Sequence, residues 1–413
     1  MGLSSRGAGA APDRRAAPVD AVKLGVITTS YPRTSRDPAG SFVAAHVDAL
    51  RALGHDVEVI AAGTPGPASR ATWIASALFD RGGAPDHLEQ HPVRTLASAA
   101  LLAARMTLAV ARRARRWDSI IAHWLVPSAI AALPTALPLL AIAHGGDIHT
   151  LRRMRLLGPV LHALYRRDAQ LAFVSEPLRA IAREAAPSLA PWLDIATVQP
   201  MGLDLARFSR IGHTPTRPPT IVIAARLVAL KGVDVAIDAI AHLRAPVRLV
   251  IAGDGPERSR LESRAAEVAA DRAAGPAGRA AGPAPGGAAG PDAGRATSRI
   301  EFLGTVDTAR RDALLREASV VVVPSRVTPT GRTEGMPMIA LEALAAGVPV
   351  VASAVGGLSD LGPAVALVRP DRPRELAAAI DRLLSEPPDA ERLRAAVADL
   401  DWGNVATRLV RNP

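Results

Sequence analysis

Short apolar runs alternate with helical segments along most of the chain, and this alternation is the strongest constraint on its fold. Residues 22–28 (VKLGVIT) form one run, and residues 56–61 (DVEVIA) form the next. Between them, residues 41–53 place apolar side chains at helical spacing and end at Gly54. A strand, a helix and a second strand in this order are typical of a doubly wound parallel sheet. The sequence therefore predicts an α/β fold.

The alternation occurs in two series, which a proline-rich segment at 213–219 separates. We expect each series to form one parallel sheet, because parallel strands are joined by helical crossovers. Two Rossmann-like, doubly wound domains that face a central cleft are the predicted architecture. The further strands expected are 119–123, 139–144, 170–174, 220–225, 248–252, 300–303, 320–323 and 348–352, and the further helices are 95–116, 151–167, 176–185 and 232–243.

Domain boundaries follow from these two series. Residues 1–20 are small, polar and basic with no apolar run after them, so we expect a disordered leader and no signal peptide. Residues 273–298 are rich in Ala, Gly and Pro and bury too little surface to offset their ordering entropy, so we expect a disordered insertion. The other predicted units are an N-terminal domain at 21–204, a linker at 205–219, a C-terminal domain at 220–395 and a terminal segment at 396–413.

The amino-acid composition limits the kinds of molecule that this protein can bind. The 413 residues include 49 Lys and Arg against 39 Asp and Glu, and the net charge of +10 suits nucleic acid, phosphorylated metabolites or an acidic membrane. Aromatic residues are only 3% and the arginines are dispersed, so we expect no nucleic-acid partner. The absence of cysteine excludes disulfides, thiolate nucleophiles and cysteine metal sites. Three prolines interrupt the apolar stretch at 120–144, so we expect no spanning helix and a cytoplasmic protein.

The strongest candidate site is the segment 333–349, TEGMPMIALEALAAGVP. It reads as a loop with Glu334, a helix that opens within Met336, Pro337 and Met338, and an end at Gly347. The amides of such a first turn form an anion site. Glu342 follows Glu334 by eight residues, about 12 Å of helical rise, which suits an elongated ligand. An ordinary surface helix with two solvated glutamates is the alternative.

Arg226 and Lys231 form the second candidate, because they directly follow an apolar strand. Side chains that leave the carboxyl end of a parallel strand reach the crevice in which such sheets bind ligands. The two cations could neutralise a departing diphosphate without Mg²⁺. A solvated pair at a helix start is the alternative. The Gly-Asp-Gly-Pro at 253–256 lacks the third glycine of a dinucleotide fingerprint, so we interpret it as a tight turn.

The segment 144–149, HGGDIH, ends another apolar strand. Its two histidines and Asp147 match no metal-site spacing, so we expect no metal, and we interpret His144 as a polar group that lines the cleft. A turn histidine with a local partner is the alternative. Gly40, where the first loop meets the first helix, either approaches a phosphate or makes a turn. We exclude the Asp-x-Asp at 399–401 as a metal–nucleotide motif, because no strand precedes it.

Two helical segments, 95–116 and 151–167, combine apolar residues with several arginines. Such a surface can lie on an anionic membrane. The alternative is a helix that faces the core and solvates its arginines.

Taken together, these motifs resemble those of the GT-B fold glycosyltransferases of family 4, over essentially all of residues 22–412 apart from the insertion. The most specific element is the pair Glu334 and Glu342 with ARL…KG before it. The matching segments, in chain order, are GSFVAAHVDALRALGHDVEVI, AHW, HGGD, FVSEPL, MGLDLARF, ARLVALKG, VIAGDGPERSRLE, FLGTV and PS…EGMPMIALEALAAGVPVVASAVGGL.

The resemblance implies a retaining hexosyl transfer from a nucleotide diphosphate-sugar, with no metal and no other cofactor. The N-terminal domain would then hold the acceptor and the C-terminal domain the donor. Segment 400–410 resembles the family's terminal helix, which packs back on the first domain. The resemblance assigns Arg226 and Lys231 to the diphosphate and Gly40 to the donor phosphate. It assigns Glu334 and the backbone segment of Gly335, Met336, Pro337 and Met338 to the donor sugar and phosphate. It assigns Glu342 to the ribose, His144 to the reacting sugar, and Gly304 to Val306 to the nucleobase.

Some positions depart from the family pattern. Met201 stands where Asn is usual, Ala225 where Gly is common and Asp360 where Glu is customary, and the loop 361–366 is short. The implied acceptor is a saccharide or lipid-linked saccharide, as in surface polysaccharide or glycolipid synthesis, with a peripheral position on the inner membrane face. A sugar-nucleotide epimerase of the same fold and a non-catalytic nucleotide-sugar-binding protein are the alternatives.

Overall fold

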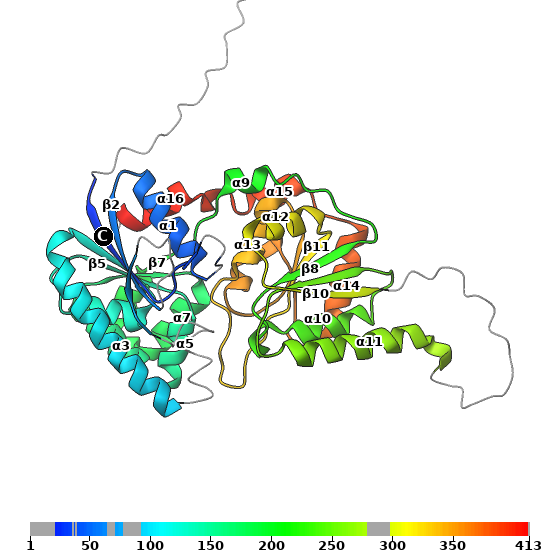
Figure 1. Ribbon diagram of the computed structural model, residues 1–413, viewed down its shortest axis with the longest axis horizontal. Coiled ribbons are helices and arrows are strands. Elements are labelled where there is room, and N and C mark those ends of the chain that lie inside the picture. Colours follow the sequence, from blue (N-terminus) through cyan, green and yellow to red (C-terminus); the bar gives the residue numbers. More distant parts are fainter. Residues whose placement is uncertain are drawn as a thin grey trace, which may run out of the picture.

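The computed structural model contains two α/β halves that lie side by side, each built on its own parallel sheet (Figure 1). It describes residues 21–34, 37, 39–63, 71–76, 92–278 and 298–411. The predicted leader at 1–20 and most of the predicted insertion lie outside these ranges. Every pair of neighbouring strands in the two sheets is parallel. The prediction of two doubly wound domains is therefore confirmed.

The first sheet has the strand order β3-β2-β1-β4-β5-β6-β7. Its strands read as apolar runs because helices cover both faces of a parallel sheet, and β5 is buried along its whole length. Its strands are β1 (Lys23–Thr28), β2 (Asp56–Ala62), β3 (Thr72–Ile74), β4 (Ser119–His123), β5 (Leu139–Ala143), β6 (Gln170–Phe173) and β7 (Thr197–Val198), and its helices are α1 (Ser41–Ala52), α3 (Pro92–Arg113), α4 (Ile130–Ala132), α5 (Gly146–Arg153), α6 (Leu157–Arg166), α7 (Glu176–Ala185) and α8 (Ala190–Asp194).

The second sheet has the strand order β10-β9-β8-β11-β12-β13. Its strands are β8 (Thr220–Ala224), β9 (Arg248–Ala252), β10 (Arg299–Gly304), β11 (Val320–Val323), β12 (Val350–Ser353) and β13 (Ala366–Val368). The helices of this half are α9 (Leu205–Ser209), α10 (Val233–Ile240), α11 (Arg258–Gly278), α12 (Thr308–Glu317), α13 (Met338–Ala346), α14 (Pro373–Ser385) and α15 (Ala390–Ala395), and the chain closes with α16 (Trp402–Arg411).

Several helix boundaries differ from the sequence prediction. The helix expected at 151–167 is two helices, α5 and α6, because Arg155 adopts a left-handed φ of 58° between them. Pro337 immediately precedes α13 instead of lying in its first turn. Helix α11 continues through Gly278, past the expected start of the insertion at 273, because the preceding alanines favour helix. Ser298, the last residue of the predicted insertion, accepts a hydrogen bond from the Val247 amide through its hydroxyl.

The segment predicted as a linker, 205–219, carries part of the second core. Phe208 of α9 and Ile211 after it are 2% and 5% exposed and pack in the apolar cluster of the second half. Both side chains are apolar, so their removal from water stabilises the second half. The crossing from one half to the other therefore lies before α9.

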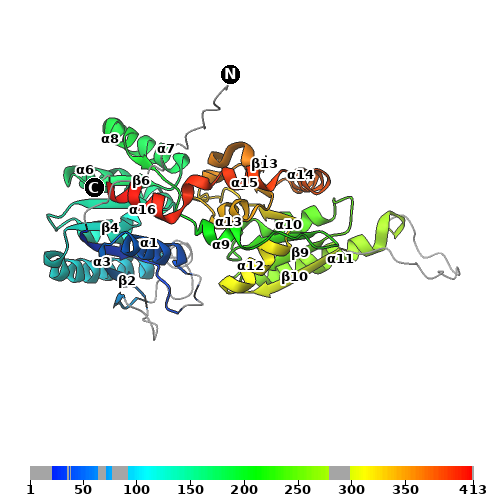
Figure 2. The same cartoon turned by 90° about the horizontal axis from the view of Figure 1, so that it is seen from above.

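Helix α16 returns to the first half, as Figure 1 and Figure 2 both show by its position along α1. Val405, Ala406 and Leu409 are buried in the core of the first half, and the Trp402 ring stacks on His46 of α1 with a centroid distance of 5.6 Å. The two halves are thus connected by two chain crossings.

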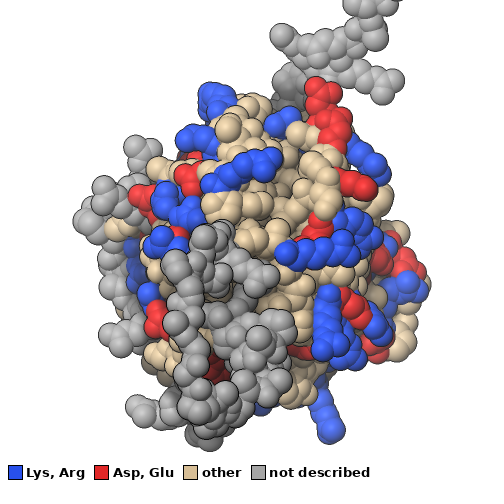
Figure 3. Space-filling model, turned by 90° about the vertical axis from the view of Figure 1, so that its right-hand side faces the viewer, with Lys and Arg blue, Asp and Glu red and all other residues tan. Residues whose placement is uncertain are grey.

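The end of the second half opposite the first half carries interspersed charges of both signs (Figure 3). On α11, for example, Arg260 pairs with Glu257 and Asp234, and Arg264 pairs with Asp238. Among the described residues, no helix is both long enough and apolar enough to span a bilayer.

The burial of α16 predicts that Leu409→Ala destabilises the first half by about 2–5 kcal/mol, the usual cost of truncating a buried leucine. All five tryptophans, Trp73, Trp117, Trp124, Trp192 and Trp402, pack on the first core, so tryptophan fluorescence in a urea titration reports on that half. The matched control is Asn404→Ala, at an exposed position of the same helix. Equal midpoints for the two variants would show that α16 is not part of the first core.

Candidate active site

The candidate site lies where the order of strands reverses in each sheet. In the first sheet this point lies between β1 and β4, and in the second between β8 and β11. Loops that leave neighbouring strands at such a point diverge to opposite faces of the sheet and open a crevice at the carboxyl ends. Gly40 follows β1, Arg226 follows β8, and the loop with Glu334 follows β11.

Lys231 and Glu334 form the closest charged contact of the site. The Lys231 ammonium lies 2.6 Å from Oε1 of Glu334, and the Ser325 hydroxyl donates to the same oxygen at 3.2 Å. Glu334 is only 8% exposed, so its charge is balanced locally. Gly232 makes the approach possible: a Cβ there would lie 2.0 Å from the Pro324 carbonyl oxygen. The structure brings these two predicted residues together.

Gly335 brings the site of the second half against the first half. A Cβ on Gly335 would lie 2.1 Å from the His144 carbonyl oxygen, and one on Gly145 would lie 3.0 Å from the Gly335 Cα. Met336 and Met338, on either side of Pro337, pack against the cores of both halves. The amides at the start of α13 therefore lie at the junction of the domains, and first-turn amides have no intrahelical partner.

Arg226 is partly buried on a platform of three packed loops. A Cβ on Gly253 would lie 1.8 Å from the Ala225 carbonyl oxygen, and the Gly253 amide donates to the Gly304 carbonyl at 2.7 Å. A Cβ on Gly255 would lie 2.3 Å from the Leu227 carbonyl oxygen. The Gly-Asp-Gly motif thus lets the loop after β9 support the segment that carries Arg226. The interpretation as a tight turn agrees with this geometry.

Glu342 is buried and paired with a residue that no motif indicated. It is 6% exposed, and its Oε1 lies 3.0 Å from Nη1 of Arg311 on α12. Burial raises the pKa of Glu342, and the Arg311 charge opposes that rise. Val306, in the loop before α12, packs on the second core. The structure thus pairs Glu342 with Arg311, whereas Glu334 pairs with Lys231.

Three histidines form a chain of contacts behind the site. His123 Nδ1 lies 3.0 Å from His144 Nε2, and His123 Nε2 lies 3.1 Å from His46 Nδ1. The rings of Trp124 and Phe42 pack against His144 at 4.6 and 5.2 Å. Burial lowers the pKa of His46 to about 4 and that of His144 to about 3, and it lowers the pKa of His123 in the same direction. All three rings are therefore neutral at neutral pH.

Gly40 has a left-handed backbone conformation and lies close to the backbone of Ser30. It begins α1 with a left-handed φ of 65°, and a Cβ there would lie 2.3 Å from the Ser30 carbonyl oxygen. The loop before it is shaped by Asp37, whose carboxylate accepts from the amides of Arg33 and Ala39. Only glycine fits this position, which lies in the loop between β1 and α1.

The other polar residues of the HGGDIH segment have structural partners. The buried Asp147 carboxylate accepts from the amides of Leu125, Gly145 and Ile148 at 2.8–3.0 Å. His149 Nε2 accepts from the Thr333 hydroxyl at 3.1 Å and from its amide at 3.3 Å, a contact between the two halves. Among the described residues, no three His, Asp or Glu side chains gather in a way that could hold a metal ion.

Two of the positions that depart from the family pattern, and the Asp-x-Asp segment, make hydrogen bonds or pack in a core. Asp360 accepts from the Glu176 amide at 2.7 Å across the domain junction, and Met201 is buried in the first core. Asp401 accepts from the Gly403 amide at the start of α16. These contacts are structural.

The sequence analysis predicted no role for His46, His123, Arg311 or Thr333, although all but Arg311 lie within segments that it singled out. Two of them had a signal: His46 lies on the apolar face of its helix with Val43, Val47 and Leu50, and His123 ends a buried strand. A histidine in such a position needs a polar partner once buried. Arg311 and Thr333 had no comparable signal, because their partners come from distant segments.

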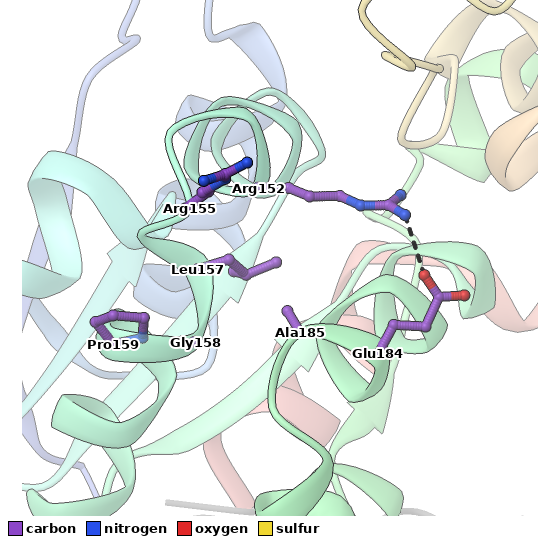
Figure 4. A pocket seen from close by; sticks show the side chains of 7 residues that line it. All are labelled: Arg152, Arg155, Leu157, Gly158, Pro159, Glu184 and Ala185. Carbon is purple, nitrogen blue, oxygen red and sulfur yellow. Dashed lines mark hydrogen bonds and ion pairs between the residues drawn. The ribbon is translucent and has the colours of Figure 1, made fainter.

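A surface hollow lies outside this arrangement (Figure 4). Arg152 spans it toward Glu184, 3.1 Å away, with Arg155 beside it on the loop between α5 and α6. None of the predicted site residues lines it.

Known proteins match the chain across both halves. Residues 39–207 match the family model described as Glycosyltransferase Family 4, and residues 206–272 and 280–386 match models described as Glycosyl transferases group 1. A glycogen synthase of Mycobacterium tuberculosis is 29% identical over 94% of this chain and 93% of its own. Sucrose-phosphate synthase from Thermosynechococcus elongatus has a TM-score of 0.65 at 19% identity, covering 94% of this chain and 98% of that one. Anabaena HepE in complex with UDP and glucose has a TM-score of 0.64 at 17% identity, covering 95% and 99%.

The burial of Glu342 predicts that Arg311→Ala destabilises the second half by about 3–5 kcal/mol, because it removes the ion-pair partner of a buried carboxylate. Adding Glu342→Gln to this variant should recover part of the loss. Urea unfolding followed by circular dichroism measures both, and Arg310→Ala, at an exposed position beside it, is the matched control. An Arg311→Ala protein as stable as this control would show that the pair does not balance a buried charge.

Proposed function

This chain belongs to the GT-B glycosyltransferases of family 4, and on that basis we propose that it transfers a hexose from a nucleotide diphosphate-sugar with retention of anomeric configuration. The observation that carries the proposal is the ion pair of Lys231 with Glu334 beside Gly335, which seats the start of α13 against the first half. Cations and helix-start amides are the groups that bind a diphosphate.

In the proposed reaction, the bond between the anomeric carbon and the diphosphate oxygen breaks while the acceptor hydroxyl bonds to the same face of that carbon. The acceptor proton passes to the departing diphosphate. The charge that develops on the leaving group meets Arg226, Lys231 and the α13 amides, and such preorganised charges usually make the largest contribution to catalysis. We propose no metal for this step, because the two cations and the helix start supply positive charge themselves.

The carboxylates support this assignment. Glu334 is ion-paired with Lys231 and Glu342 with Arg311, and both carboxylates can accept hydrogen bonds from hydroxyl groups. Neither forms the facing acid and base pair that hydrolysis of a glycosidic bond employs. We assign Glu334 to hydroxyl groups of the donor sugar and Glu342 to the ribose, with His144 facing the reacting sugar and Gly304 and Val306 near the base. HepE, a structural neighbour, was solved with UDP and glucose, which makes UDP-sugars the first donors to test.

For the acceptor, we propose a saccharide or lipid-linked saccharide of surface polysaccharide or glycolipid synthesis, met at the inner membrane face. An exposed face of α3 supports this proposal. Leu101 and Leu108 are 61% and 50% exposed, and Arg105 and Arg112 lie exposed on the same side. The spacing of these four residues places them along one side of the helix, and a face that combines leucines with arginines suits an anionic membrane surface.

The diphosphate assignment predicts that Arg226→Ala and Lys231→Ala each lower kcat/KM by about 10²–10³-fold, the cost of removing one preorganised charge. UDP release from a panel of UDP-sugars, with and without saccharide acceptors, measures this, and nuclear magnetic resonance of the product gives its anomeric configuration. Arg244→Ala, an 89% exposed arginine of the same half, is the control. Undiminished transfer in the first two variants would contradict the assignment. An isomerised UDP-sugar without acceptor would indicate an epimerase instead, and binding without turnover a non-catalytic protein.

The membrane assignment predicts that Leu101→Glu with Leu108→Glu weakens sedimentation with phosphatidylglycerol vesicles about tenfold or more, because each buried leucine contributes roughly 1.5–3 kcal/mol. The control is Leu367→Glu, an exposed leucine of the second half. If the double variant and the control sediment alike, α3 is not the membrane-binding face.

A further inference from the structure

His46, His123 and His144 form a chain of ring contacts whose two ends differ in exposure. It leads from α1 through the end of β4 to the end of β5, with each ring nitrogen contact at 3.0 or 3.1 Å. His46 and His123 are fully buried, whereas His144 is partly exposed at the domain junction. The chain therefore has a buried end and an end that a ligand can reach.

The positions of the protons in this chain are restricted to two arrangements. Each neutral imidazole carries one N–H, and each contact needs one N–H and one bare nitrogen. If His123 carries its proton on Nδ1, then His46 must donate from Nδ1 and His144 must also hold its proton on Nδ1. If His123 carries its proton on Nε2, then all three rings hold theirs on Nε2. In any mixed arrangement, at least one pair of facing ring nitrogens has either no proton or two protons between them.

The buried end decides between the two arrangements. Within the described part of the chain, His46 Nε2 is buried and has no hydrogen-bond partner. The Trp402 ring that stacks on His46 lies nearly parallel to it, at 14°, and so covers the face of the imidazole. A buried N–H without an acceptor is rarer in proteins than an acceptor without a donor. The arrangement with all protons on Nδ1 avoids such an orphaned N–H at His46.

We infer that His46 and His123 are positioning residues that hold the proton of His144 on Nδ1, so that His144 donates a hydrogen bond to an oxygen of the donor sugar. The inference rests on the proposed function for the identity of that ligand. It assigns a direction to the contact: Nε2 of His144 is occupied by His123, and Nδ1 carries a proton. His144 therefore selects a hydroxyl or phosphate oxygen and does not accept the proton of the acceptor hydroxyl.

The proton positions can be read without any substrate. In the full chain labelled with ¹⁵N-histidine, long-range nuclear magnetic resonance correlations distinguish a protonated ring nitrogen from a bare one, and His→Gln variants assign the signals. We expect all three histidines to show the proton on Nδ1 at neutral pH. A His144 protonated on Nε2 would overturn the inference, whether or not the protein transfers a sugar.

Two substitutions of His46 test the consequence for turnover. Asn keeps an N–H where Nδ1 lies, whereas ionised Asp, at almost the same volume, offers only acceptor oxygens there, so that His123 and then His144 hold their protons on Nε2. We expect H46D to lower kcat for UDP-sugar about tenfold or more, toward the 10²–10³-fold cost of a lost preorganised donor, with a KM close to that of H46N. We expect H46N to retain most of the wild-type kcat and the Nδ1 proton of His144.

The outcomes separate this inference from the proposed function. If the wild type releases no UDP from any sugar donor, the proposed function fails, and the ¹⁵N spectra of the wild type and H46D still decide the proton positions. If the wild type is active but H46D keeps both its kcat and the Nδ1 proton of His144, the positioning role is wrong. If H46D does not fold, the wild-type spectrum alone decides.

Discussion

The ion pair between Lys231 and Glu334 is the contact on which the rest of the site depends. It joins the loop after β8 to the loop after β11, at 2.6 Å, in a place where Glu334 is almost fully buried. Because an unpaired carboxylate there would be costly, the pair fixes the loop before α13. Gly335, the next residue, then seats that loop against the His144 carbonyl of the other half. A single charged contact thus sets both the local shape of the site and the junction of the domains.

The two halves contact each other through hydrogen bonds and through methionine side chains. His149 accepts from Thr333, and Asp360 accepts from the Glu176 amide, while Met336 and Met338 pack on both cores. Methionine suits such a position because its unbranched side chain adapts to irregular surfaces. These contacts place the loop that carries Glu334 and the start of α13 directly beside the first half.

Much of the fold could be predicted from the sequence, because parallel strands covered on both faces must be continuous apolar runs. The strands at 119–123, 248–252 and 320–323 match the structure to the residue. The break between α5 and α6 could not be predicted, since it depends on a left-handed Arg155, which nothing in its residue type requires. The burial of α9 within the expected linker could not be predicted for a related reason: its apolar residues acquire a core only when the second half is assembled.

The site was predicted as a set of residues but not as a set of pairs. Motif spacing indicated Lys231, Glu334 and Glu342, yet spacing does not reveal that Arg311, thirty-one residues before Glu342, pairs with it.

The most direct test of the proposed donor site is a crystal structure of the chain with UDP. We predict diphosphate oxygens in contact with Arg226, Lys231 and the amides at the start of α13, in the junction beside His144. A diphosphate bound elsewhere, with Lys231 still held only by Glu334, would contradict it.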